Sequence, residues 1–286
     1  MQSVIVCLIT CILFLCSTAS ASEKEKIVPK DLDAQQMEEL AAKSGVDPTR
    51  QRDKMAIIYE RDNYPHDTYS YLPPGGLFPR RWPASPALSR WIARGGYTIK
   101  KGPAEGLYLQ LDVPFQATFS GIPFNSATGL GDLKFTFLYT WGKPELKFAF
   151  ASENTINTAE KKQLGGGATT LGPALAVSKR VARPMFAIAA LQYSFDVEKD
   201  SDVAYTNLLA LRLFALNFWP KLFFTVIEVR PAYDFRTNHT TILFAPQVGK
   251  ILGKHFSVTL YSQQPLDSWS RNRMGTQYKA TATYNF

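Results

Sequence analysis

Charged residues of both signs occupy the polar positions of several long segments in which apolar and polar residues alternate. Alternating residues of a strand point to opposite faces, so these charges would share the face that is not apolar. Such a face could select charged solutes, or its charges could pair with one another and fill the space between strands. The candidates are Asp112, Lys134, Lys147, Arg212, Glu228, Arg230, Asp234 and Lys279.

Two of these candidates, Glu228 and Arg230, stand two residues apart and therefore on the same face of one segment. They could form ion pairs with Arg212 and Lys279 only if the corresponding strands are neighbours. The sequence does not determine which strands are neighbours.

A different chemistry, lipid hydrolysis, would need a nucleophile and a histidine base within hydrogen-bond reach. His66 lies in a proline-rich loop, and His255 begins a segment at the end opposite the longer loops. His239, beside Thr241, is the histidine best placed for this role, but no serine stands two residues from it. We therefore expect no enzyme, and keep a lipid hydrolase that uses His239 as an alternative.

The composition disfavours metal, cofactor and nucleic-acid chemistry. The three cysteines, Cys7, Cys11 and Cys16, fall in an apolar N-terminal run, and the histidines lack metal-ligand spacing. The 32 basic and 24 acidic side chains give a formal charge of +8, but they form no dense Lys/Arg tract. We expect no metal, no cofactor and no nucleic-acid partner, while the positive excess fits an anionic lipid surface or an anionic solute.

The segments that carry the charges alternate with a period of two, which predicts β-strands. They exceed the ~5 to 6 residues of an ordinary sandwich strand and reach the ~9 to 11 that a tilted strand needs to cross a bilayer. The apolar faces of three such segments would be formed by Leu107, Leu109, Leu111, Val113, Phe115, Ala117 and Phe119; by Leu133, Phe135, Phe137, Tyr139 and Trp141; and by Phe223, Ile227, Val229, Tyr233 and Phe235.

Strands can cross a membrane only in a closed barrel, because no backbone edge then faces lipid. Ten strands follow Gly106, and residues 90–100 and 55–60 would add an eleventh and a twelfth. An even number is required if both chain ends lie on one side. We predict an all-β fold, a transmembrane antiparallel barrel of about 12 strands with 10 as the alternative.

The connections and the aromatic residues point to an outer-membrane barrel. Short turns at 142–145, 179–184, 217–221 and 252–255 alternate with longer loops, although the link at 236–239 is short for its side. Short periplasmic turns and longer extracellular loops are typical of such barrels, as is a girdle of aromatic residues at strand ends. The predicted girdle residues are Tyr139, Trp141, Tyr193, Phe195, Tyr233 and Phe235.

The N-terminal part reads as two units that precede a barrel over residues 55–286. Residues 1–21 combine an apolar run with a small-residue cleavage site and predict a secretory signal peptide. Residues 22–54 form a polar leader with a short helix that Asp31 could cap and that Gly45 and Pro48 would end. We favour a solvated leader over a docking or plug helix, because one short amphipathic helix is marginal alone.

The last residues alternate strictly and end on phenylalanine. This pattern resembles the signal by which Gram-negative cells fold barrels into the outer membrane, which implies the barrel assembly machinery and outer-membrane lipid or lipopolysaccharide as partners. The residues that fit it are Tyr278, Ala280, Ala282, Tyr284 and Phe286.

Several segments of the body resemble one group of such barrels, the transporter-like outer-membrane proteins named after the meta-pathway of phenol degradation. The resemblance implies a passive outer-membrane channel for small, often hydrophobic molecules; together with the charges, we expect passage of small hydrophobic or anionic solutes. A non-conducting structural or surface-binding barrel is the alternative. The segments are TGLGDLKF (128–135), GGATTLGPALAVSK (166–179), LQYSFD (191–196), DSDVAYTNLLAL (200–211) and APQVGKIL (245–252).

Overall fold

The computed structural model describes residues 33–64, 87–101, 104–120, 126–182, 184–201, 203, 205–267 and 275–286. The predicted signal peptide with its cysteines, residues 22–32 of the leader, most of the proline-rich loop and His66 lie outside the described residues.

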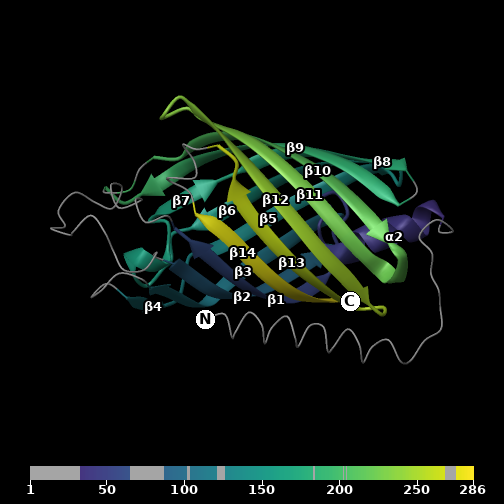
Figure 1. Ribbon diagram of the computed structural model, residues 1–286, viewed down its shortest axis with the longest axis horizontal. Coiled ribbons are helices and arrows are strands. Elements are labelled where there is room, and N and C mark those ends of the chain that lie inside the picture. Colours follow the sequence, from purple (N-terminus) through teal and green to yellow (C-terminus); the bar gives the residue numbers. More distant parts are fainter. Residues whose placement is uncertain are drawn as a thin grey trace.

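The described chain forms a closed antiparallel barrel of 12 strands, as predicted (Figure 1). Two wall positions are each shared by a short and a long segment: β4 and β5 both pair with β3, and β7 and β8 both lie between β6 and β9. The extended segments are β1 (Lys54–Asn63), β2 (Ala87–Thr98), β3 (Leu107–Ser120), β4 (Ala127–Gly129), β5 (Leu133–Lys143), β6 (Leu146–Ile156), β7 (Ala168–Leu171), β8 (Pro173–Ala182), β9 (Met185–Lys199), β10 (Asn207–Trp219), β11 (Phe223–Asp234), β12 (His239–Leu252), β13 (Phe256–Pro265) and β14 (Thr276–Asn285).

The first and last strands close the barrel. β1 pairs with β14 along its whole length, from Lys54 opposite Asn285 to Asn63 opposite Thr276. β1 and β2 correspond to the predicted strands at 55–60 and 90–100. The alternative of 10 strands is therefore wrong.

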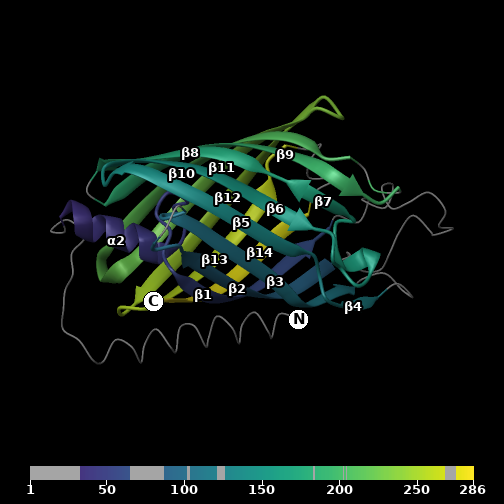
Figure 2. The ribbon, with the colours of Figure 1, turned by 180° about the vertical axis from the view of Figure 1, so that it is seen from behind.

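The two ends of the barrel differ, and Figure 2 shows them from behind. One end carries the helix α2 (Ala34–Ser44), the C-terminus and the short turns, and we call it the α2 end. The other end carries the longer connections, such as residues 157–167, and we call it the loop end. The turn between β11 and β12, residues 235–238, is short on the loop end, as the sequence indicated.

The outer face of the wall is apolar. Ile57, Leu111, Leu175 and Ile227 are all more than 40% exposed, whereas residues beside them, such as Ala56, Asp112 and Glu228, are buried on the inner face. This arrangement suits a wall whose outer surface contacts lipid.

The alternation in β3 changes phase, and the sequence missed this. The register of β2 and β3 shifts between Trp91 and Ile92, where Trp91 faces Gln116 and Ile92 faces Pro114. The extra residue is Phe115, and such a bulge exchanges the two faces of a strand. Ala117 is consequently buried with an inward-facing cluster against which Phe119 packs, so their predicted place on the outer face is wrong.

The helix α2 is part of the folded barrel and is not a solvated leader. Asp33 caps it, because its side chain accepts from the Gln36 N–H at 2.8 Å while the Gln36 side chain accepts from the Asp33 N–H at 3.1 Å. Asp31, the predicted cap, lies outside the described residues. Met37 and Ala41 are fully buried, so the predicted solvated state is wrong.

Candidate functional site in the barrel lumen

The middle of the barrel encloses a cavity of about 540 Å³ whose walls are largely polar. Six of the eight predicted charged residues line it: Asp112, Lys134, Arg212, Glu228, Arg230 and Lys279. The other two lie near the ends. Lys147 forms an ion pair with Glu38 of α2, and Asp234 lies 3.7 Å from Arg236 at the loop end.

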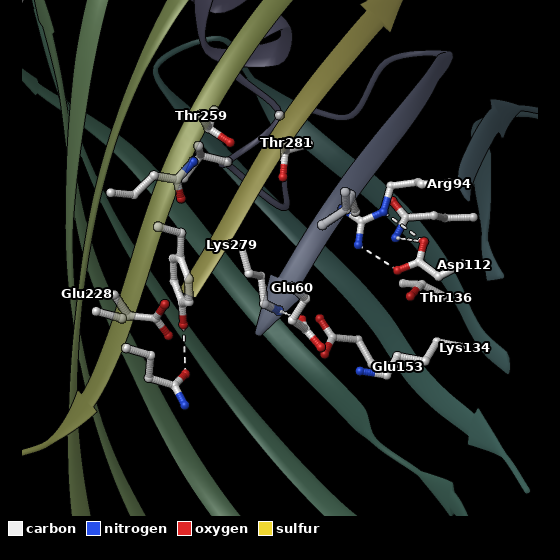
Figure 3. A pocket seen from close by; sticks show the side chains of 18 of the residues that line it. Glu60, Arg94, Asp112, Lys134, Thr136, Glu153, Glu228, Thr259, Lys279 and Thr281 are labelled. Atoms are coloured by element: carbon white, nitrogen blue, oxygen red, sulfur yellow. Dashed lines mark hydrogen bonds and ion pairs between the residues drawn. The ribbon is translucent and has the colours of Figure 1, made fainter. Parts of the chain in front are cut away.

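Arg94 and Asp112 form a bidentate pair on the cavity wall between β2 and β3 (Figure 3). Arg94 Nε donates to Asp112 Oδ1 at 2.7 Å and Nη2 donates to Oδ2 at 2.6 Å. Gln110 also donates to Asp112, at 3.3 Å. Two parallel hydrogen bonds fix the guanidinium plane, so this pair forms a rigid part of the wall.

Glu60 is the centre of a second cluster, which spans the seam between β14 and β1. Its carboxylate forms ion pairs with Lys279 and with Arg90, both at 2.5 Å. Arg90 also contacts Asp62, and Gln277 donates to Asp62 at 2.7 Å. Glu60 is almost fully buried, so these cations compensate for its lost hydration.

Glu228 is the centre of a third cluster, on β10 and β11. It accepts from Arg212 at 2.8 Å and from Arg230 at 2.7 Å, and Arg212 lies 3.6 Å from Glu153 on β6. β10 and β11 are neighbours, so Arg212 reaches Glu228. Lys279 does not belong to this cluster, because β12 and β13 separate β14 from β11.

The cavity lining carries an excess of positive charge. Six basic residues (Lys54, Arg94, Lys134, Arg212, Arg230, Lys279) face four acidic residues (Glu60, Asp112, Glu153, Glu228). The sequence-based candidates did not include Lys54, Glu60, Arg94 or Glu153. A signal existed for two of them, because Lys54 and Glu60 occupy the face of β1 opposite Met55, Ile57 and Tyr59.

Apolar residues line the interior at the α2 end and receive the helix. Met37, Leu40 and Ala41 pack into a cluster with inward-facing residues of four neighbouring strands. The wall residues of this cluster are Phe186, Ile188, Phe214, Leu216, Phe218, Phe224, Val226 and Ile251. Ser44, Gly45 and Val46, at the end of the helix, line the cavity, so α2 and the following residues form its floor.

A buried polar network fastens the floor to the wall. Arg50 Nη1 pairs with Asp47 and donates to Ser178 Oγ at 2.5 Å, and Ser178 donates to Asp47 at 2.7 Å. Arg50 Nη2 donates to the Pro144 carbonyl at 2.7 Å. The Arg50 and Asp47 side chains are fully buried, so their mutual compensation depends on the segment staying in place.

The start of β1 and the C-terminal residue meet beside this floor. The Asp53 carboxylate accepts from the Thr98 N–H at 2.7 Å and from Lys100 at 2.8 Å, while the Asp53 carbonyl accepts from the Phe286 N–H at 3.1 Å. Partial burial acts to raise the pKa of Asp53, but the hydrogen bonds from Lys100 and Thr98 outweigh it and lower the pKa.

At the loop end, the connection between β6 and β7 turns inward. The Asp132 carboxylate accepts from the backbone N–H groups of Thr158, Ala159 and Gly166 at 3.1, 3.0 and 2.6 Å. These bonds place Leu164 against Leu88, Ala117 and Ala127 on the inner face of the wall. This segment therefore narrows the lumen on the side opposite α2.

The two described histidines lie near the ends of strands. His239 Nε2 is 3.8 Å from Asp267 at the loop end, and His255 Nδ1 is 2.8 Å from the Asn285 carbonyl at the α2 end. Among the described residues, no group of three or more His, Cys, Asp or Glu side chains is placed to hold a metal ion. In the same part of the chain, no helix has the length and apolar character to cross a membrane.

Comparison with known proteins places the fold among outer-membrane barrels. No protein-family model and no curated protein matches the chain. An outer membrane channel from Pseudomonas putida F1 is similar in structure, with 12% identity, 82% of this chain and 96% of the other covered, and a TM-score of 0.60. The NanC porin is also similar, with 8% identity, 80% of this chain and 100% of the porin covered, and a TM-score of 0.53. The KdgM porin has 9% identity, with 81% of this chain and 99% of the porin covered, and a TM-score of 0.51. The chain thus has the fold of outer-membrane channels and porins.

Proposed function

We propose that the protein is an outer-membrane channel through which small solutes diffuse passively. The observation that carries the proposal is a closed barrel with an apolar outer face around a cavity lined by fixed charges. Charged side chains that face a lumen select solutes, whereas charges on the lipid face are costly. The structural similarity to channels and porins supports the same function.

Two groups of outward aromatic side chains support placement in a membrane. At the α2 end, the Trp141 ring centroid lies 6.1 Å from that of Tyr139 and 5.9 Å from that of Phe148. At the loop end, Tyr233 and Phe235 lie 4.9 Å apart. Aromatic residues gather at the two interfaces of membrane barrels, so these groups mark the membrane boundaries.

We extend the proposal to export and assembly. Residues 1–21 would direct export, and the α2 end would then face the periplasm. Phe286 and the outward residues of β14 would be recognised by the barrel assembly machinery, and the resemblance to the meta-pathway group supports a transporter role. We expect deletion of Phe286 to reduce the folded, heat-modifiable band in outer-membrane fractions; normal insertion of the shortened chain would contradict this.

A non-conducting barrel is a second candidate, because α2 and the segment around Leu164 occupy the two ends of the lumen. Planar-bilayer recording of the refolded protein separates the two. A channel gives discrete current steps whose size changes in Arg230→Ala, while the exposed turn variant Lys254→Ala serves as the matched control. A correctly folded barrel that gives no steps would contradict the channel.

A further inference from the structure

The positive excess of the cavity can be assigned to particular side chains. Each of the four lining carboxylates already has a cationic partner: Asp112 has Arg94, Glu60 has Lys279, Glu228 has Arg212 and Arg230, and Glu153 has Arg212. Four of the six lining cations are used in these pairs. The remaining two are Lys54 and Lys134.

Lys54 is satisfied without an anion. Its ammonium donates to the Gln51 side chain at 2.9 Å and lies 5.7 Å from the centre of the Tyr108 ring. The residue is only 5% exposed, so little of its side chain is open to the cavity. Lys54 is therefore not available as a binding group for a solute.

Lys134 is placed differently, on the cavity-facing side of β5. Its neighbours across the sheet are Asp112 on β3 and Thr155 on β6, and Thr136 follows on its own face. The nearby carboxylates of Glu60, Asp112 and Glu153 are held by other cations, as Figure 3 shows for Asp112 and Glu60. Within the described part of the chain, Lys134 forms no ion pair of its own.

An ammonium group that is partly removed from water and lacks a counter-ion gains most from an anion that comes with the solute. The hydroxyl groups of Thr136 and Thr155 could complete the hydrogen bonds of a carboxylate held by Lys134. The same cavity is bordered by Ile58, Ile92, Phe214 and Val226, so it also offers an apolar surface.

From this geometry we propose that the lumen holds a binding site for a small carboxylate with an apolar body, anchored by Lys134. The inference rests on the proposed channel function and names the class of solute that the channel prefers. The cavity of about 540 Å³ lies within the range of small-molecule sites, ~300 to 1,000 Å³. The carboxylate would lie at Lys134 and the apolar body toward the side chains that border the floor.

Equilibrium binding tests the site independently of conduction. Isothermal titration of the detergent-solubilised full chain with hexanoate, at low ionic strength, is expected to show saturable binding, whereas hexan-1-ol and hexylammonium bind far more weakly. Lys134→Gln is expected to weaken hexanoate binding roughly tenfold, about the factor that 1.4 kcal/mol represents. Lys134→Arg retains the charge and most of the binding, and the exposed variant Lys254→Gln binds as the wild type does.

Each variant must show the wild-type heat shift in SDS gels, so that loss of binding is not loss of fold. Equal hexanoate binding by wild type and Lys134→Gln, or no binding by the wild type, would overturn the site. Bilayer recording then distinguishes the two proposals. Current steps that hexanoate does not reduce would contradict the site alone, whereas a silent barrel that binds hexanoate through Lys134 would contradict only the channel.

Discussion

The middle of the lumen and its α2 end are lined by the same strands but by opposite kinds of residue. On β11, Glu228 and Arg230 face the charged cavity, while Phe224 and Val226, on the same face, are apolar. On β10, Arg212 and then Leu216 and Phe218 show the same change. An inward position therefore does not imply a polar residue; its chemistry depends on whether water or α2 covers it.

The two regions are also stabilised differently. Burial of a Met or Leu side chain contributes about 1.5 to 3 kcal/mol, so the apolar region is held mainly by the contact with α2. An isolated helix of 11 residues is marginal in water, and α2 therefore owes its structure to the wall that it covers. The charged region is held instead by ion pairs within the wall, which do not require α2.

The largest effect is expected from a charge placed in the apolar region. Met37→Asp combined with Ala41→Asp would bury two unpaired carboxylates, so α2 should leave the wall. Because a helix with its side chains is about 10 Å wide, its departure should raise single-channel conductance roughly twofold or more. Bilayer recording measures this, with the exposed-face variant Gln35→Asp as control. Unchanged conductance in the double variant would show that α2 does not obstruct the lumen.

A smaller effect is expected from removal of one charge in the middle of the lumen. Glu228→Gln leaves Arg212 and Arg230 sharing a neutral amide, and we expect a loss of about 2 to 3 kcal/mol in the free energy of unfolding. The variant should also make the current more selective for anions, because the lining gains net positive charge. Urea unfolding in lipid vesicles and reversal potentials measure the two effects, with the exposed turn variant Glu105→Gln as control. No change in either quantity would mean that the Glu228 cluster is not formed.

The smallest effect concerns Asp53, which lies next to the floor and outside the strands. Its pKa is lower in the folded protein, so its contribution to stability is present above about pH 4 and is lost as the pH falls through the folded value. The stability difference between wild type and Asp53→Asn should therefore shrink between about pH 5 and pH 2. Because Lys100, the ionic partner of Asp53, is largely exposed to solvent, we expect a difference below about 1 kcal/mol. A constant difference over this range would contradict a role for its charge.

The sequence predicted the barrel well because its information is local. Alternation and turn lengths locate the strands, and the order of neighbouring strands follows from hairpins. Two features could not be predicted from the sequence, for physical reasons. The bulge at Phe115 adds one residue and inverts the faces of β3. The pairing of Glu60 with Lys279 depends on closure of the barrel between β1 and β14, which are far apart in sequence.

The sequence did not predict the role of α2, for a related reason. Inward apolar residues such as Phe224 and Leu216 do not stand out in the sequence, because each has an apolar residue, Phe223 or Ala215, beside it on the outward face. These side chains need to be shielded from water by α2 only once the barrel has closed and they face its interior. The placement of Lys134 without a partner is likewise a property of the assembled wall, since its sheet neighbour Asp112 is taken by Arg94.

The attachment of the floor has a consequence for the order of folding. Arg50 contacts Ser178, 128 positions later, and Arg52 Nε donates to the Phe286 carbonyl, 234 positions later. Contacts over such distances form late, because the intervening chain must first be ordered. The helix α2 therefore has no surface to pack against until the strands from β8 to β12 have formed. We therefore expect that α2 packs against the wall and β1 pairs with β14 in the same final, slow phase of folding.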